Sequence, residues 1–214
     1  MYPQGNLFIP TTHGRIEAIL KEPDKRFSPQ TGAALILHPH PQFGGTMHNK
    51  VVFRTARALN ECGILTLRFN YRGVGLSTGI FGEGEGEMED ARACLDYLAQ
   101  KYPNFSIMLA GFSFGARYGL EVGINDSRVI RLIGIGTPVD KYDFDFLKSC
   151  RKPILFVQGE RDEFGSTEKL IELTSTLPPE ANAQVEIIQS TGHFFDGKLD
   201  ELVKAIKEWT LKPL

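Results

Sequence analysis

Residues 107–116 join a short apolar run to a helical pattern through a Gly-x-Ser-x-Gly turn. The apolar run at 107–110 has the length and composition of a buried strand, and Gly-Phe-Ser-Phe-Gly occupies 111–115. A serine at such a sharp turn needs small residues two positions before it and two after, because a Cβ there would collide with neighbouring backbone. Gly111 and Gly115 meet this need. The pattern predicts a nucleophile elbow at Ser113, with a plain strand-to-helix turn as the alternative.

Apolar runs of strand length alternate with helical patterns along most of the chain. The first predicted element is an antiparallel hairpin that turns near residues 12–14. Further strands are predicted at 33–37, 64–69, 131–136, 153–158 and 185–189, and helices at 49–62, 88–101, 114–123, 166–177 and 199–211. Such alternation predicts an α/β fold with a mostly parallel sheet, here as a single domain over residues 1–214. Ligands of such sheets bind where the strands end, so functional side chains are expected in the loops that follow strands.

Composition and charge indicate which binding partners and which cellular compartment to expect. The chain is 42% hydrophobic and 23% charged, which is typical of a globular protein, and its net charge of −2 favours neither nucleic acid nor an anionic membrane as partner. Residues 1–10 do not resemble a signal peptide, and no apolar run is long enough to span a bilayer. The three cysteines, at 62, 94 and 150, form neither a disulfide framework nor a metal motif. We therefore expect a cytoplasmic protein.

Two late loops carry an acid and a base in positions that complement the elbow. Asp162 follows the strand predicted at 153–158, and His193 follows the strand predicted at 185–189. A serine hydroxyl becomes a strong nucleophile when an imidazole takes its proton, and a carboxylate holds that imidazole in the correct tautomer. Ser113, Asp162 and His193 are therefore the predicted catalytic residues.

Each of these residues also has a structural interpretation. A lone histidine after a strand is often a capping residue, and an aspartate in a loop is often a turn residue. Two other carboxylates compete with Asp162 for the same role. Glu160 is better interpreted as a loop anchor, and Asp140, which follows the preceding strand, ranks below Asp162.

The loop at 38–45 reads His-Pro-His-Pro-Gln-Phe-Gly-Gly and is the candidate source of an oxyanion hole. Two backbone N–H donors are needed, and the residue after the nucleophile, Phe114, supplies one. Proline has no N–H, which leaves His40, Gln42 and Phe43 for the other. We favour His40, with Gln42 as second choice. His38 is interpreted as a structural hydrogen-bonding residue.

Glycine and glutamate alternate over residues 82–89, just before a predicted helix with an apolar stripe. Acidic residues at the start of a helix and Lys101 at its end suit the helix dipole. We interpret this run as a solvated helix start in preference to a calcium site.

Together these segments resemble the α/β-hydrolase superfamily over nearly the whole chain. More narrowly, they resemble small lid-less bacterial serine hydrolases related to dienelactone hydrolases and short-chain esterases. The segments that carry the resemblance are 38–47, 68–73, 111–115, 159–162 and 192–195. The resemblance implies a three-layer α/β-hydrolase fold with a mostly parallel central sheet, no cap domain and no cofactor or metal. The chain departs from lipases in having His-Pro-His-Pro where they carry His-Gly-Gly-Gly. It also departs from dienelactone hydrolases, which use a cysteine nucleophile, and this argues against dienelactone as substrate.

The predicted function is a serine hydrolase that cleaves carboxylic esters through an acyl-enzyme. Residues 137–152 are too few to hold a helical cap, so an open site is expected, suited to small or flexible acyl substrates. Four aromatic residues are expected to border it, with simple packing as an equal alternative: Tyr142, Phe144, Phe146 and Phe164. A thioesterase, acyltransferase or peptidase with the same triad is the alternative function, and a noncatalytic binding module is a third. We expect a monomer or homodimer that acts on a small-molecule ester or acyl substrate.

Overall fold

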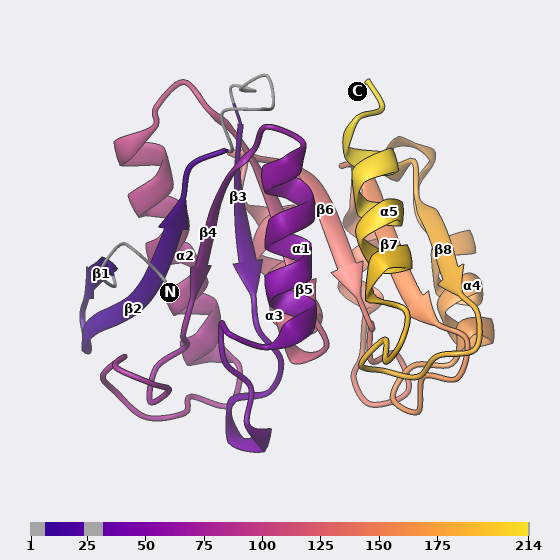
Figure 1. The fold of residues 1–214 in the computed structure, drawn as a ribbon, viewed down its shortest axis with the longest axis horizontal. Coiled ribbons are helices and arrows are strands. Elements are labelled where there is room, and N and C mark those ends of the chain that lie inside the picture. The colour runs from indigo at the N-terminus through magenta and orange to yellow at the C-terminus, as the bar shows by residue number, and fades with distance from the viewer. Residues whose placement is uncertain (1–6, 24–31, 214) are drawn as a thin grey trace.

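The computed structural model describes residues 7–23 and 32–213, and Figure 1 shows them arranged around one twisted sheet. Its strands are β1 (Leu7–Thr11), β2 (Gly14–Lys21), β3 (Gly32–Leu37), β4 (Leu65–Phe69), β5 (Ser106–Phe112), β6 (Val129–Ile135), β7 (Ile154–Gly159) and β8 (Gln184–Ile188). Within the described residues they lie in the order β1-β2-β4-β3-β5-β6-β7-β8. Strands β3 to β8 run parallel, and the β1–β2 hairpin adds an antiparallel edge beside β4.

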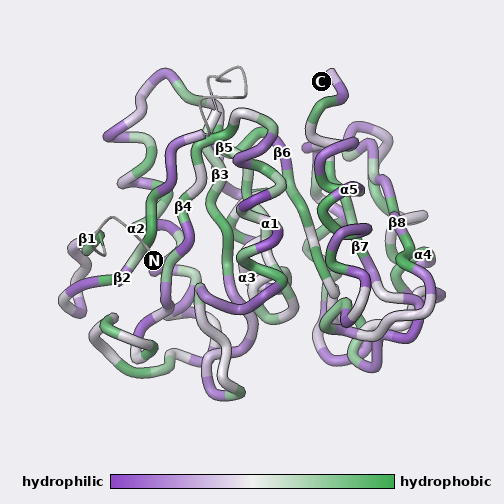
Figure 2. The backbone as a smooth tube through the Cα atoms, in the orientation of Figure 1, coloured by the Kyte–Doolittle hydropathy of each residue, from purple (hydrophilic) through white to green (hydrophobic). Residues whose placement is uncertain are grey.

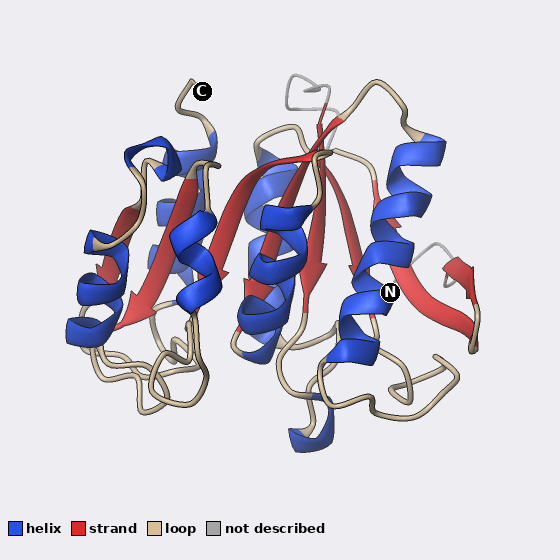
Figure 3. Cartoon of the chain, turned by 180° about the vertical axis from the view of Figure 1, so that it is seen from behind, coloured by secondary structure: helices blue, strands red, loops and turns tan. Residues whose placement is uncertain are grey.

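Helices cover both faces of this sheet. They are α1 (Lys50–Glu61), α2 (Glu85–Lys101), α3 (Phe114–Asn125), α4 (Thr167–Ser175) and α5 (Leu199–Thr210). Short 3-10 helices occur at η1 (Pro41–Phe43), η2 (Asp145–Ser149) and η3 (Pro179–Ala181). Helices α1 and α5 lie in front of the sheet in Figure 1, and α2 and α3 lie on the opposite face, which Figure 3 shows from behind. The prediction of a three-layer α/β fold with a mostly parallel sheet is confirmed.

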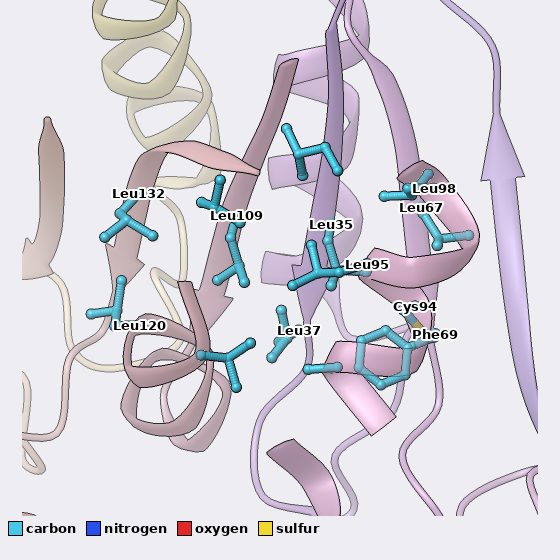
Figure 4. Close-up of a cluster of buried hydrophobic side chains, with 14 of the residues drawn as sticks. Leu35, Leu37, Leu67, Phe69, Cys94, Leu95, Leu98, Leu109, Leu120 and Leu132 are labelled. Atoms are coloured by element: carbon cyan, nitrogen blue, oxygen red, sulfur yellow. The ribbon is translucent and has the colours of Figure 1, made fainter. Parts of the chain in front are cut away.

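The central strands are apolar on both faces because both faces are covered. In β3, Leu35 and Leu37 pack on the side of α2 and α3, whereas Ala34 and Ile36 pack on the side of α1 and α5. Figure 4 shows the first of these clusters, with Leu35 beside Leu95 of α2. Along the tube of Figure 2 the central strands are largely green, while many exposed helix positions are purple. A continuous apolar run therefore corresponds to a strand buried on two sides.

The parallel strands end at one edge of the sheet, and the loops that follow them gather there. In Figure 1 the arrowheads of β3, β6, β7 and β8 all point to this lower edge. The connection from β6 to β7 contains only loop and η2, so no cap domain is inserted between these two described strands. Among the described residues, no helix is both long enough and apolar enough to cross a membrane.

The start of α2 is only partly the solvated helix start that the sequence predicted, because Glu83, Glu85 and Glu89 are exposed but Glu87 is not. The side chain of Glu87 is fully buried, and its two carboxylate oxygens accept the N–H groups of Gly82 and Gly84 at 3.0 and 2.8 Å. Asp90, also buried, accepts the backbone N–H and the guanidinium of Arg72 at 2.7 and 2.8 Å. Buried carboxylates are tolerated when they are hydrogen-bonded in this way. These acids tie the loop after β4 to α2.

The three cysteines lie in the protein interior. Cys62, Cys94 and Cys150 are all buried and carry free thiols. Burial raises the pKa of the Cys94 thiol well above its usual value, and nearby Asp90 adds to this shift. A thiol held in this protonated state acts as a small apolar side chain.

Candidate active site

Ser113 occupies the sharp turn between β5 and α3. Its backbone lies at φ +57° and ψ −119°, a strained conformation for a residue with a side chain. A Cβ on Gly111 would collide with the carbonyl of Gly115, and a Cβ on Gly115 would lie 2.6 Å from the carbonyl oxygen of Leu37. Both glycines are therefore needed for the close approach of α3 to β5 and β3. This backbone conformation and these two glycine contacts are the features that a nucleophile elbow requires.

His193 and Asp162 meet beside this turn although they come from loops that follow different strands. The Nδ1 atom of His193 lies 2.8 Å from Oδ2 and 3.0 Å from Oδ1 of Asp162. Both side chains are buried, and Asp162 also accepts the N–H of Phe164 at 2.9 Å. An ionised carboxylate accepts hydrogen bonds only, so Nδ1 carries the proton and Nε2 is left able to accept one.

Contacts between the two loops fix this pair. The N–H of Arg161 donates to the carbonyl of Thr191 at 2.9 Å, and the N–H of Ser190 donates to the Glu160 carboxylate at 2.8 Å. A Cβ on Gly159 would lie 2.6 Å from the carbonyl oxygen of Gly192, so the loops touch backbone to backbone. Glu160 is thus a loop anchor, as its position suggested.

The other competing carboxylate lies outside the site. Asp140 accepts the N–H of Ser166 at 2.6 Å and lies 3.6 Å from the Lys169 ammonium. These contacts fix the loop after β6 to the start of α4. The partner of His193 is Asp162.

Ser113 and His193 open into one cavity of about 630 Å³ at the carboxyl edge of the sheet. This volume is within the range of small-molecule binding sites. The walls are mostly aromatic and backbone surface, contributed by Pro39, His40, Phe43, Gly44, Gly45, Asn49, Phe114, Pro138, Lys141, Tyr142, Phe164 and Phe194. Among these described wall residues, Lys141 is the only lysine, arginine or acid. The cavity therefore offers an apolar surface with a few polar groups beside the serine.

The aromatic border of the cavity differs in part from the sequence prediction. Tyr142 and Phe164 line it as predicted, but Phe144 and Phe146 do not. Phe144 is buried, and its ring and that of Phe146 both pack against the guanidinium of Arg117. The η2 turn directs these two rings toward α3, and the packing interpretation is the correct one for them.

The rings of Phe43 and Phe194 also line the cavity, and the sequence did not predict this. Phe43 of η1 is 85% exposed, and Phe194 lies directly after His193 with its ring 5.2 Å from the imidazole. Phe43 belongs to the loop at 38–45 and Phe194 follows His193, and these two positions were the signals available. Phe164 packs on the same imidazole, with ring centroids 4.7 Å apart. The imidazole is therefore shielded from water on more than one side.

The two residues predicted to supply oxyanion donors contact each other through their rings. The ring of His40 is 4.7 Å from the ring of Phe114, and both residues line the cavity. No hydrogen bond in the described part of the chain uses the N–H of either residue. The second choice, Gln42, donates its N–H to Nδ1 of His40 at 3.2 Å and is not on the cavity wall. This arrangement favours His40 over Gln42.

His38 has the structural role that the sequence predicted. Its imidazole is fully buried, accepts the N–H of Tyr71 at Nε2 at 3.1 Å, and contacts the carbonyl oxygen of Pro39 through Nδ1 at 2.6 Å. Burial lowers the pKa of His38 to about 3, and the hydrogen bond to Pro39 opposes this only in part. Burial also lowers the pKa of His40, opposed by the charge of Glu87. In the described residues no group of three or more His, Cys, Asp or Glu side chains is placed to hold a metal ion.

Comparison with known proteins agrees with this fold. Residues 33–207 match the family described as alpha/beta hydrolase domain, and the chain belongs to that family. An uncharacterized protein of Rickettsia prowazekii is 38% identical over 205 residues, which cover 92% of this chain and 85% of that protein. The protein is thus an alpha/beta hydrolase.

Solved structures place it more narrowly beside lid-less members. An α/β serine hydrolase without a lid from Xanthomonas campestris is 34% identical, with a TM-score of 0.88 over 95% of this chain and 92% of that one. An alpha-beta serine hydrolase homologue from Coxiella burnetii is 33% identical, with a TM-score of 0.90 over 99% of each chain. The resemblance stated from the sequence motifs is confirmed.

Proposed function

We propose that this protein is a serine hydrolase that cleaves carboxylic esters through an acyl-enzyme. The observation that carries the proposal is the joint placement of Ser113 at a strained elbow and of the His193–Asp162 pair on one cavity. A serine at a sharp turn can by itself be an ordinary turn residue, and a histidine–carboxylate pair by itself is a common structural contact. Together on one cavity they form a nucleophile, a base and an orienting group.

The first half of the reaction makes the acyl-enzyme. Nε2 of His193 takes the proton of the Ser113 hydroxyl as its oxygen attacks the ester carbonyl, and Asp162 stabilises the resulting imidazolium. The negative charge that develops on the carbonyl oxygen is bound by the N–H groups of Phe114 and His40. The C–O bond of the ester then breaks, and the imidazolium gives its proton to the departing alkoxide, which leaves as the alcohol.

The second half returns the free enzyme. A water molecule gives one proton to Nε2 of His193, and its oxygen attacks the acyl carbon. The same two N–H groups bind the oxyanion again. When the bond to Ser113 breaks, the serine oxygen recovers a proton from His193 and the carboxylic acid is released.

The cavity wall indicates which acyl groups fit. Aromatic and proline surface favours an apolar acyl chain, and the absence of a cap leaves room for a chain that projects to solvent. Lys141 is exposed at the wall, and no ion pair within the described chain occupies its ammonium group. An acyl chain that carries a carboxylate at its far end would meet this ammonium. We therefore include half-esters of dicarboxylic acids among the proposed substrates.

The test combines active-site labelling with turnover. A fluorophosphonate probe should label the native protein at Ser113 and leave the Ser113→Ala variant unlabelled. Esters of p-nitrophenol, from acetate to laurate, should be hydrolysed by the native protein alone. Labelling that survives in Ser113→Ala would refute the proposed nucleophile. Faster turnover of acyl-CoA than of any oxygen ester would instead support a thioesterase with the same triad.

A further inference from the structure

The side chain of His38 contacts the peptide unit that carries the proposed second oxyanion donor. Nδ1 of His38 lies 2.6 Å from the carbonyl oxygen of Pro39, and this carbonyl forms a peptide unit with the N–H of His40. His38 itself is fully buried behind the cavity wall and does not line the cavity. His38 therefore cannot contact a substrate directly, but it contacts the peptide unit whose N–H would.

The proton on this imidazole has only one possible position. The N–H of Tyr71 lies 3.1 Å from Nε2, and an amide N–H can only donate. Nε2 is therefore the acceptor, and Nδ1 carries the hydrogen and donates it to the Pro39 carbonyl. Because burial lowers the pKa of His38 to about 3, this neutral tautomer persists through the neutral and mildly acidic range.

Peptide geometry turns this hydrogen bond into a constraint on His40. The carbonyl of Pro39 and the N–H of His40 belong to one planar unit, and the described chain contains no cis peptide bond. In a trans peptide the N–H points opposite to the C=O. The Nδ1–H of His38 holds the Pro39 oxygen on the buried side. The N–H of His40 is therefore directed away from the buried side. Withdrawal of electron density from the oxygen also makes the N–H a stronger donor.

The far side of the same peptide is held by backbone alone. A Cβ on Gly45 would collide with the Pro39 carbonyl oxygen, so only glycine fits against it. The N–H of Gly45 donates to the His40 carbonyl at 3.0 Å, and so does the N–H of Phe43 at 3.1 Å. The carbonyls on both sides of the His40 Cα are thus engaged, while the N–H of His40 remains unused in the described structure.

We propose that His38 is a positioning residue of the oxyanion hole, whose Nδ1–H holds the Pro39–His40 peptide so that the His40 N–H faces the reacting carbonyl. This inference rests on the proposed function, because it assigns a role within that site. It predicts an effect on the transition state and little effect on ground-state binding, since the oxyanion exists only in the former.

Two substitutions separate the two hydrogen bonds of the imidazole. Asparagine places an amide group where Nδ1 stands, so His38→Asn keeps a donor for Pro39 and loses the acceptor for Tyr71. Glutamine reaches the place of Nε2, so His38→Gln keeps the acceptor for Tyr71 and loses the donor for Pro39. Kinetics of p-nitrophenyl butyrate hydrolysis are measured for both variants, the native protein and Ser113→Ala.

We expect kcat of His38→Gln to fall about 10- to 100-fold, with KM within about 3-fold of native. Removal of one oxyanion donor lowers kcat about 10²–10³-fold, and in this variant the donor is misdirected rather than removed. His38→Asn should keep kcat within about 3-fold. A boronic acid inhibitor, which forms a tetrahedral adduct at the serine, should bind His38→Gln more weakly by the same factor as kcat/KM falls.

A purely structural role would give a different pattern. Equal losses of kcat in the two variants, or a rise in KM with kcat unchanged, would overturn the proposal. Gly45→Ala serves as an independent variant, because it displaces the Pro39 oxygen from the other side and leaves His38 intact. It should lower kcat with KM retained, and native-like kcat in Gly45→Ala would also overturn the proposal. If the native protein and Ser113→Ala hydrolyse the ester equally, the proposed function has failed rather than this inference.

Discussion

Replacement of His38 by glutamine should remove part of the pH dependence of folding stability. The unfolded chain binds a proton at this histidine with a pKa near 6.5, whereas burial holds the pKa in the folded protein at about 3. Between these values the unfolded state takes up a proton that the folded state does not. The folded state is therefore most favoured above pH 6.5, and this contribution is lost as the pH falls.

The size of the effect follows from the two pKa values. One proton taken up by the unfolded state alone lowers the free energy of unfolding by about 1.4 kcal/mol per pH unit well below pH 6.5. Between pH 7 and pH 5 this slope integrates to a loss of about 2 kcal/mol in the free energy of unfolding, due to His38 alone. The figure depends mainly on the pKa of the unfolded chain, because the folded value lies well below pH 5.

Urea unfolding at pH 7, 6 and 5 measures this contribution. His40 and the carboxylates also titrate, so the quantity to compare is the difference between the native protein and His38→Gln at each pH. His38→Gln should be less stable at pH 7, and this difference should shrink by about 2 kcal/mol by pH 5. A difference that stays constant to within about 0.5 kcal/mol would show that His38 is not buried in its neutral form.

Four further substitutions test other parts of the structure. Asp162→Asn should lower kcat for p-nitrophenyl esters about 10⁴-fold with the fold retained by circular dichroism, and a loss below about 10-fold would contradict its role. Gly111→Ala forces a Cβ against the Gly115 carbonyl and should lower the free energy of unfolding by about 1–3 kcal/mol in urea, whereas native-like stability would contradict the close approach of α3. Arg131 donates to the carbonyls of Trp209 and Thr210 at the end of α5 at 2.8 and 3.2 Å. Arg131→Met should therefore lower the free energy of unfolding by about 1–3 kcal/mol, measured as a lower Tm. Lys141→Glu should lower kcat/KM for the succinate half-ester about 3- to 10-fold and leave butyrate unchanged, and equal effects on both esters would exclude charge recognition.

Much of the fold could be predicted because its signals are local. Strands buried on both faces need unbroken apolar runs, so the expected strand at 153–158 differs from β7 by one residue at each end. The elbow glycines were predictable for the same reason, since the clash that excludes a Cβ at Gly111 involves a residue four positions along the chain. Pro29 predicts a loop over residues 27–32. Residues 27–31 lie outside the described part of the chain, and Gly32 is the first residue of β3.

The candidate site was predictable in its residue types and less so in its surroundings. Ser113, Asp162 and His193 were recognisable because each follows a strand, and parallel strands end at one edge of the sheet. For Phe144 the sequence left cavity lining and simple packing as equal alternatives, because the direction of a side chain in a short turn depends on what it packs against. Glu87 was expected in solvent, and its burial depends on the backbone amides that happen to surround it.

The order of strands and helices, the sharp turn at Ser113 and the candidate nucleophile, acid and base could all be predicted from the order of residues. The hydrogen bonds that these groups make depend on the three-dimensional packing. Tyr71 and His38 are distant in the chain, and no local pattern connects them. Their contact arises because β3 and β4 are neighbours in the sheet and end at the same edge. Hydrogen bonds need partners within about 3 Å and a defined direction, so they depend on a packing that the order of residues does not display.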